Sequence, residues 1–230
     1  MASPGRAVGA VFEGALPDLF DAELDGVRVL ASPIGGALTD LSPDERALVA
    51  SAVVRRQAEF ATGRRLARRL LSDLGRPVDA LLRDEDRVPR WPAGVVGSIS
   101  HAIGMCVVAV APTDRVAALG VDVEPDAPLE AALWSRIATP RELEALARWP
   151  ESDRGVLAHA LFSVKECVYK AAFPKRRERW GFQDVEVRLL PERGRFEAET
   201  PSARPGERER VAGRLLRRGG FLVAGVAHAR

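Results

Sequence analysis

Hydrophobic and polar positions along the chain follow two patterns, a helical one and an extended one. A capping box opens the first long helical pattern, with Ser42 as the N-cap, Pro43 in the first helical position and Glu45 three residues after the cap. The pattern continues to Leu74, and Gly75 follows it as a typical end signal. The sequence therefore predicts one helix from Ser42 to Leu74.

Apolar runs of the extended kind lie on both sides of this helix. Residues 27–31 form a short run before it, and residues 95–100 and 105–111 form two longer runs after it. The connection between these two is four residues long and ends in glycine, which predicts an antiparallel hairpin. A further strand is expected over residues 116–124, beyond the break at Pro112.

The second half of the chain repeats this mixture. Another capping box, Thr139 to Glu142, opens a short helix that should end near Trp149. A longer helix is expected from Asp153 to Ala172, because Pro174 follows it. Three more strands are expected, at residues 182–190, 195–199 and 221–228.

The predicted fold class is α+β, with helices packed on antiparallel sheets in each of two similar halves. We place the division after the hairpin, giving residues 1–114 and residues 115–230. A chain of 230 residues can bury a sizeable core. Its 47% hydrophobic and 29% charged residues are typical of a globular protein and untypical of a disordered one.

Composition also excludes several function classes. No apolar run approaches the ~20 residues of a membrane span, and no basic stretch with an apolar run opens the chain, so we expect a cytoplasmic protein without a membrane partner. Cys106 and Cys167 lie inside apolar runs, which favours reduced, buried thiols. With two cysteines and three histidines, a zinc cluster is not expected.

Two carboxylates in the stretch GVDVEP are candidates for metal binding. Asp122 and Glu124 are two residues apart in a predicted strand, so they share one face while Val121 and Val123 point to the other. Magnesium prefers such oxygen ligands. A solvated polar strand face explains an isolated pair equally well, so the pair needs support from elsewhere in the chain.

That support comes from the stretch FSVKECVYKAA in the last long helix. Only three of the 34 basic residues are lysine, and two of them, Lys165 and Lys170, flank Glu166. Glu166 and Lys170 are four residues apart and share a helix face, whereas Lys165 lies about 100° around the axis. A surface ion pair is the simpler alternative, but the surrounding apolar residues indicate burial, and buried charges need partners.

The first half offers groups that could bind an anion. Arg56 and Arg64 lie along one ridge of the predicted helix, and Gly63 inside that helix suggests the close approach of another element. Ser100 and His101 at the hairpin can donate hydrogen bonds to phosphate. Carboxylates, lysines and such donors together are typical of metal-assisted phosphoryl transfer.

With these residues in view, the chain resembles the phosphopantetheinyl transferases of the surfactin- and enterobactin-synthase type. The resemblance rests on four motifs in order, at residues 55–71, 90–101, 120–125 and 162–174. It implies two similar halves with coenzyme A bound in the cleft between them. It also implies the reaction, in which the 4′-phosphopantetheine arm passes from coenzyme A to a serine of an apo acyl or peptidyl carrier protein and adenosine 3′,5′-bisphosphate is released.

The resemblance also implies roles for individual residues. Asp122, Glu124 and Glu166 match the magnesium ligands. The matches to coenzyme A-contacting positions are Arg56, Arg64, Arg83, Ser100, His101, Lys165 and Lys170, with arginine at 83 where relatives often carry lysine. As catalytic groups it implies Glu166, as base directly or through a metal-bound water, and Lys165 and Lys170, which stabilise the phosphoryl group. Val164 and Cys167 differ from the usual motif but carry no charge.

Two rival functions remain open on the sequence alone. An acidic strand pair with a later Glu and Lys also occurs in magnesium-dependent nucleases, and the arginine-rich helix could serve a nucleic-acid-binding module. The net charge of only +2 weakens both. The expected protein is therefore a monomeric transferase without a nucleic-acid partner, serving secondary metabolism such as siderophore, polyketide or nonribosomal peptide synthesis.

Overall fold

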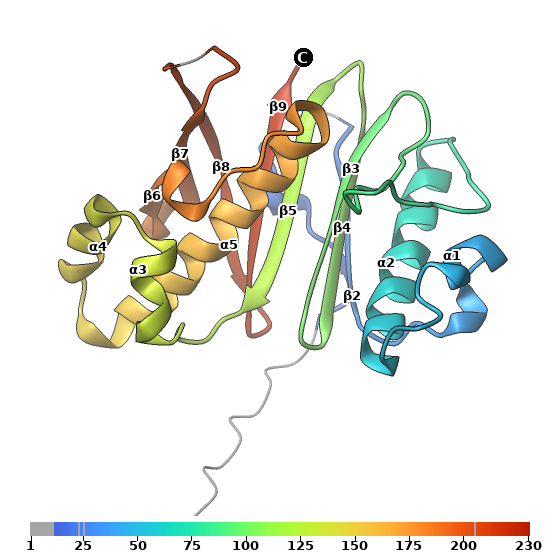
Figure 1. Ribbon diagram of the computed structural model, residues 1–230, viewed down its shortest axis with the longest axis horizontal. Coiled ribbons are helices and arrows are strands. Elements are labelled where there is room, and N and C mark those ends of the chain that lie inside the picture. The colour runs from blue at the N-terminus through green and yellow to red at the C-terminus, as the bar shows by residue number, and fades with distance from the viewer. Residues whose placement is uncertain (1–11, 23, 25, 205) are drawn as a thin grey trace, which may run out of the picture.

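Two antiparallel sheets lie face to face between two long helices (Figure 1). The computed structural model describes residues 12–22, 24, 26–204 and 206–230. The first sheet has the order β1-β2-β4-β3 and consists of β1 (Gly14–Ala15), β2 (Arg28–Pro33), β3 (Val95–Ala102) and β4 (Met105–Pro112). The second has the order β5-β9-β8-β7-β6 and consists of β5 (Val116–Pro125), β6 (Glu186–Leu190), β7 (Arg195–Pro201), β8 (Arg208–Arg218) and β9 (Phe221–Ala229).

The helices cover the outer faces of the two sheets. They are α1 (Pro43–Ala47), α2 (Val54–Asp73), α3 (Trp134–Ile137), α4 (Pro140–Ala147) and α5 (Glu151–Arg176). Short 3₁₀ turns lie at Pro17–Leu19, Leu38–Asp40, Ala131–Leu133, Phe182–Asp184 and Pro191–Arg193. In Figure 1, α2 lies against the first sheet and α5 against the second, with both sheets between them. The α+β class with helices on antiparallel sheets is confirmed.

The chain passes from the first sheet to the second between β4 and β5, close to the division predicted after residue 114. Apolar side chains of both sheets form one core between them, including Val107 of β4 and Val121 and Val123 of β5. This core joins the two halves. Whether each half is a domain in its own right stays a prediction.

Strand β5 carries the candidate ligands because its two faces differ as predicted. Val121 and Val123 face the core between the sheets, and the opposite face lies against α5. Gly120 allows this contact, since a Cβ atom there would lie 2.1 Å from the carbonyl oxygen of Cys167. The absence of a side chain at residue 120 thus brings α5 close enough for its polar groups to reach Asp122.

Serine hydroxyls connect the edges of the two sheets. The Oγ of Ser98 on β3 accepts a hydrogen bond from Val121 N at 3.1 Å, and the Oγ of Ser100 accepts one from Val123 N at 3.4 Å. All four groups are buried. Side chains of one half therefore satisfy backbone amides of the other beside the candidate site.

The prediction of one continuous helix from Ser42 to Leu74 is wrong. The capping box is present, but α1 ends at Ala47 and α2 begins only at Val54. The break lets Val49 turn inward to pack with Phe60, and the side chain of Gln57 donates to carbonyl oxygens of the break. Burial of an apolar side chain outweighs continuity of the helix here.

The bounds of the last helix also differ from the prediction. Helix α5 begins at Glu151 instead of Asp153 and continues through Pro174 to Arg176. Pro174 lies in the last turns, where its missing N–H costs only one hydrogen bond. The helix ends when Arg177 adopts a left-handed conformation and donates to the carbonyl oxygen of Phe173 at 2.9 Å.

Strand β8 was not predicted, although it pairs with both β7 and β9. Six of its eleven residues are charged, and only Val211, Gly213 and Leu215 are buried. Strand β6 is shorter than the predicted run, because residues 182–184 form a 3₁₀ turn. The other predicted strands are confirmed within a few residues at each end.

Candidate active site

Asp122 is the centre of a buried polar network between the halves. Its Oδ1 accepts hydrogen bonds from Ser100 Oγ at 2.8 Å and from Lys170 Nζ at 2.6 Å. Its Oδ2 accepts one from Ser163 Oγ at 2.8 Å. Only 2% of the Asp122 side chain is exposed, so three donors from β3 and α5 stabilise a carboxylate that burial alone would disfavour.

Glu166 lies one helical turn before Lys170 and is half-buried. Burial raises the pKa of Glu166, Lys170 lowers it, and the negative charges of Asp122 and Glu124 raise it, with a net rise above the usual value. Among the described residues the Glu166 carboxylate has no hydrogen-bond or ion-pair partner. Its carboxylate oxygens are therefore able to accept a proton or to bind a cation.

Glu124 meets a histidine that the sequence analysis did not single out. Its Oε2 lies 3.4 Å from His159 Nε2, while His159 Nδ1 lies 2.9 Å from the carbonyl oxygen of Ala127. Burial lowers the pKa of His159, but the contacts with Glu124 and Ala127 outweigh it and raise the pKa overall.

His159 and Ser163 could have been found from helical spacing. His159, Ser163, Glu166 and Lys170 follow one another at intervals of four, three and four residues, so they share one face of α5. That face meets β5. Only the last two members of this stripe, Glu166 and Lys170, were predicted as site residues from the sequence.

The donor chemistry of this cluster fits a divalent cation. Even with His159 protonated, Asp122, Glu124 and Glu166 outnumber the positive charges of His159 and Lys170, which leaves an excess of negative charge. Carboxylate oxygens are also the ligands that Mg²⁺ prefers. As arranged, however, the described residues contain no group of three His, Cys, Asp or Glu side chains able to hold a metal ion.

Lys165 does not join the cluster in this structure, and its hydrogen bonds do not support the predicted contact with a phosphate. Its Nζ donates to Glu142 Oε2 at 2.7 Å and to the carbonyl oxygens of Ile137 and Phe182 at 2.9 and 2.8 Å. An ammonium group has three protons, so all are used. The side chain is 1% exposed, and it holds α5 to α4 and to the chain after α5. Its contact with coenzyme A stays a prediction.

Arg64 supplies a strong indication of an anion site. It is 4% exposed, its guanidinium lies 4.3 Å from the ring centre of Phe60, and its Nε has no hydrogen-bond partner among the described residues. Burial lowers its pKa to about 10, and the nearby charges of Arg83 and Arg56 contribute. A buried donor without an acceptor is costly, and a bound anion would satisfy it.

Arg56 and His101 lie beside each other near this arginine. Arg56 Nη1 contacts His101 Nε2, and both side chains also contact Glu59, with Oε2 at 3.3 Å from Arg56 and 3.5 Å from His101. Gly63 permits this packing of α2 on the hairpin, because a Cβ atom there would lie 3.1 Å from Ile99. The close approach expected at Gly63 is thus confirmed.

Two small pockets adjoin the Asp122 network. One, of about 260 Å³, is lined from both halves by residues that include Ser98, Ile99, Lys170 and Phe173. The other, of about 310 Å³, is lined by Glu166, Tyr169, Trp180, Phe182 and their neighbours. Tyr169 lines both pockets. The candidate site thus combines charged groups with apolar and aromatic walls.

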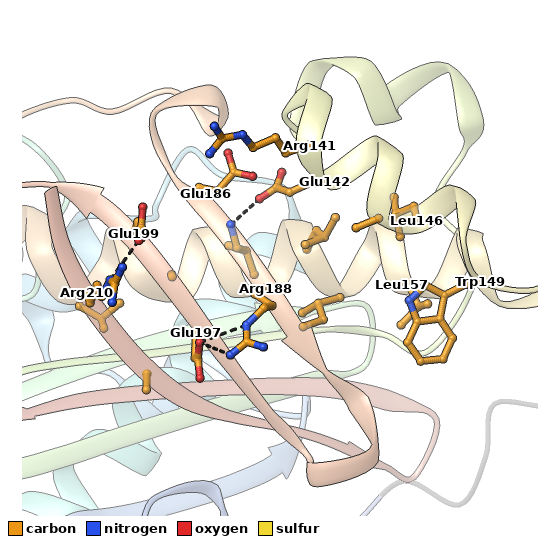
Figure 2. A pocket seen from close by; sticks show the side chains of 17 residues that line it. Arg141, Glu142, Leu146, Trp149, Leu157, Glu186, Arg188, Glu197, Glu199 and Arg210 are labelled. Atoms are coloured by element: carbon orange, nitrogen blue, oxygen red, sulfur yellow. Dashed lines mark hydrogen bonds and ion pairs between the residues drawn. The ribbon is translucent and has the colours of Figure 1, made fainter.

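A larger pocket of about 790 Å³ lies elsewhere, between α4, α5 and the strands β6 to β8 (Figure 2). Two of its three arginines pair with glutamates of the same pocket, Arg188 with Glu197 at 2.6 Å and Arg210 with Glu199 at 3.0 Å. Paired rim charges of this kind leave little attraction for a phosphate. These two arginines are therefore weaker candidates for binding a phosphate than the unpartnered Arg64 at the interface of the halves.

Comparison with known proteins decides among the functions that remain. The family profile of the 4′-phosphopantetheinyl transferase N-terminal domain matches residues 44–111, and that of the 4′-phosphopantetheinyl transferase superfamily matches residues 118–211. The chain belongs to the 4′-phosphopantetheinyl transferase superfamily. The nuclease alternative has no support, because family profiles and curated relatives alike carry the transferase description.

Three curated transferases of this family are similar to the chain. The 4′-phosphopantetheinyl transferase Svp of Streptomyces mobaraensis is 41% identical over 69% of the chain, a match that spans 65% of that relative. PptT of Mycobacterium tuberculosis is 34% identical over 78% of the chain and 78% of its own length. Npt of Nocardia iowensis is 31% identical, over 81% of the chain and 89% of its length.

In the described residues, no helix is both long and apolar enough to cross a membrane.

Proposed function

We propose that this transferase moves the 4′-phosphopantetheine arm of coenzyme A to a serine hydroxyl of an apo acyl or peptidyl carrier protein. In this reaction the bond between the two phosphates of coenzyme A breaks and a new phosphate ester forms on the serine. Adenosine 3′,5′-bisphosphate leaves, and the serine proton passes to a base. Membership of the family supports the reaction, and the polar network around Asp122 supports its location.

The arrangement of charges supports two separate phosphate-binding regions. Lys170 and Glu166 lie together at the carboxylate cluster, where the reacting diphosphate belongs. The second region is a positive group in the first half, which consists of Arg56, Arg64 and Arg83. The unpartnered Nε of Arg64 is the observation that carries this assignment. Coenzyme A has one further phosphate, on its ribose, that matches this group.

Each member of the cluster has a distinct task in this proposal. Glu166 takes the proton of the carrier serine. Lys170 stabilises negative charge on the transferred phosphoryl group, and Ser100 and Ser163 hold Asp122 in place. Lys165 has no direct part in the chemistry because its donors are already used.

Asp122, Glu124 and Glu166 would hold a magnesium ion, whose charge would neutralise the diphosphate. The pocket beside Glu166 has aromatic walls that suit the uncharged pantetheine arm and exclude water from it. The protein is proposed to act as a cytoplasmic monomer on carrier proteins of siderophore, polyketide or nonribosomal peptide synthesis.

The test is incubation of the protein with purified apo acyl and apo peptidyl carrier proteins, read by mass spectrometry of the intact carrier. A phosphopantetheine adduct should form only with coenzyme A and Mg²⁺ both present. A carrier with its acceptor serine changed to alanine is the control. No adduct on either class of carrier, from protein that is folded, would refute the proposal.

A further inference from the structure

The turn between Arg83 and Pro89 holds one arginine in an unusual conformation. Arg87 has a φ of 67°, in the left-handed region that favours glycine. Among the described residues the only other non-glycine with a positive φ is Arg177, whose conformation follows from its place at the end of α5. Arg87 caps no helix, and glycine would adopt this φ at less cost. The presence of arginine here therefore points to a role for its side chain.

The acidic side chains nearest to Arg87 in sequence pair with other residues. Asp84 Oδ2 lies 2.7 Å from Arg177 Nη1, and Asp86 Oδ1 lies 3.1 Å from Arg179 Nη2, so both pairs cross from the first half to the second. In the described part of the chain, the guanidinium of Arg87 makes no hydrogen bond or ion pair. The residue is exposed and keeps its charge available.

Arg87 also lines the pocket between the halves. It does so together with Val88, Pro89 and Ile99 on one side and Phe173 on the other. The guanidinium of Arg179 lines the pocket too, but it is paired with Asp86, which leaves Arg87 as the guanidinium of this lining without an ion pair among the described residues. Apolar walls beside such a guanidinium suit a flat base attached to a charged group. The pocket therefore combines a place for a base with a place for a phosphate.

The charge of Arg87 adds to the positive group of the first half. Burial lowers the pKa of Arg83, and the charges of Arg87 and Arg56 lower it further, which places the three guanidinium groups within electrostatic range of one another. Like charges repel unless an anion lies between them. The carboxylate cluster takes the diphosphate, so the phosphate left for this group is the one on the ribose.

We propose that Arg87 is a specificity-determining residue that binds the 3′-phosphate of coenzyme A and so separates it from 3′-dephospho-coenzyme A. The proposal rests on the proposed use of coenzyme A. Arg87 extends the positive group beyond the three arginines matched by the resemblance. The left-handed backbone of Arg87 costs some folding free energy, and in this proposal it places a guanidinium at the rim of the pocket.

The experiment compares wild type with Arg87→Gly and Arg87→Lys by titration calorimetry, with coenzyme A and 3′-dephospho-coenzyme A as ligands. Glycine removes the charge and suits the backbone, so the Tm of Arg87→Gly should stay equal or rise. Its Kd for coenzyme A should rise about tenfold, while its Kd for the dephospho compound stays unchanged. Arg87→Lys should keep most of the discrimination. Arg90→Ala, on the same loop but outside the pocket lining, is the control and should bind both ligands as wild type does.

Two results would overturn the proposal. One is an unchanged Kd for coenzyme A in Arg87→Gly, and the other is an equal loss for both ligands. Because binding is measured without transfer, a wild-type protein that binds coenzyme A but modifies no carrier refutes the proposed function and leaves this test intact. Failure of wild type to bind coenzyme A refutes both.

Discussion

Lys165 and Lys170 lie five residues apart on α5, and each forms a short ion pair, yet the surroundings of the two pairs differ. Lys165 and Glu142 are each 1% exposed at 2.7 Å, and every proton of Lys165 has an acceptor within the protein. Lys170 pairs with Asp122 at 2.6 Å, but its side chain is 29% exposed and lines a pocket. A lysine whose three protons all have acceptors within the protein supports the fold. A lysine that lines a pocket can also contribute its charge to a bound substrate.

Helix geometry explains why two neighbouring lysines diverge. A separation of five residues turns the side chain about 140° around the axis. Lys165 therefore points toward α4 and the chain after α5, whereas Lys170 points toward β5. Substitutions at each pair and at Glu166 should therefore have different effects on turnover and on stability.

Glu166, on the same face as Lys170, should show the largest effect on turnover. Glu166→Gln keeps the shape but removes the charge and the basic oxygen, so kcat should fall by roughly 10²–10⁴-fold. The measurement is kcat at saturating Mg²⁺ and coenzyme A from pH 6 to 9. If excess Mg²⁺ restores near wild-type turnover, Glu166 is a ligand and not the base.

The fold-supporting pair should show its effect in stability. Lys165→Met leaves Glu142 buried without its cation, which should cost about 3–5 kcal/mol of unfolding free energy at pH 7. Urea unfolding measures this cost, and Lys175→Met, an exposed lysine on the same helix, is the matched control. A loss no larger than that of the control would show that the pair does not support the fold.

The same variant should also depend on pH in a defined direction. Burial raises the pKa of Glu142, and Lys165 at present lowers it. Without Lys165 the folded-state pKa rises further above the unfolded value, so the folded state binds the proton more tightly. The destabilisation by Lys165→Met should therefore shrink as the pH falls from 7 toward 5, and a cost that grows over this range would contradict the account.

The Lys170–Asp122 pair should show the opposite balance from Lys165–Glu142, with a large loss of turnover and a small loss of stability. Lys170→Met should lower kcat by about 10²–10³-fold, because a positive charge aimed at the phosphoryl group is lost. Its loss of stability should be smaller than that of Lys165→Met, since Ser100 and Ser163 still donate to Asp122. Steady-state kinetics and urea unfolding on the same preparations provide both values.

Ser163 should show the smallest effect. Ser163→Ala removes one hydrogen bond to Asp122 Oδ2, which should lower kcat about tenfold at most and leave the KM for coenzyme A unchanged. Ser163→Thr keeps the hydroxyl and should retain most of the rate. Ser152→Ala, an exposed serine at the start of α5, should change neither quantity.

The strand prediction succeeded at the carboxylates because alternation fixes direction in a strand. Asp122 and Glu124 were placed on one face and Val121 and Val123 on the other, and β5 packs in that way. The helix prediction was less complete. Lys165 was grouped with Lys170 because both flank Glu166 in the sequence. Two positions five residues apart in a helix do not share a face, and the two side chains point apart.

Long-range contacts could not be predicted from local patterns. Nothing around Glu142 in the sequence indicates that it accepts from Lys165 and also from Val187 N at 2.6 Å. In the same way, Arg68 and Leu81 N both donate to Glu45, which looks like a simple capping residue in the sequence. Such residues become structural only when distant segments meet.

The division of labour between the two lysines is tested most directly by the turnover number of Lys165→Met per folded molecule. The rate of carrier modification is divided by the folded fraction obtained from urea unfolding under the same conditions. The account predicts a value within about threefold of wild type, since Lys165 contacts no reacting group. A loss of about 10²-fold or more per folded molecule, equal to that expected for Lys170→Met, would contradict it.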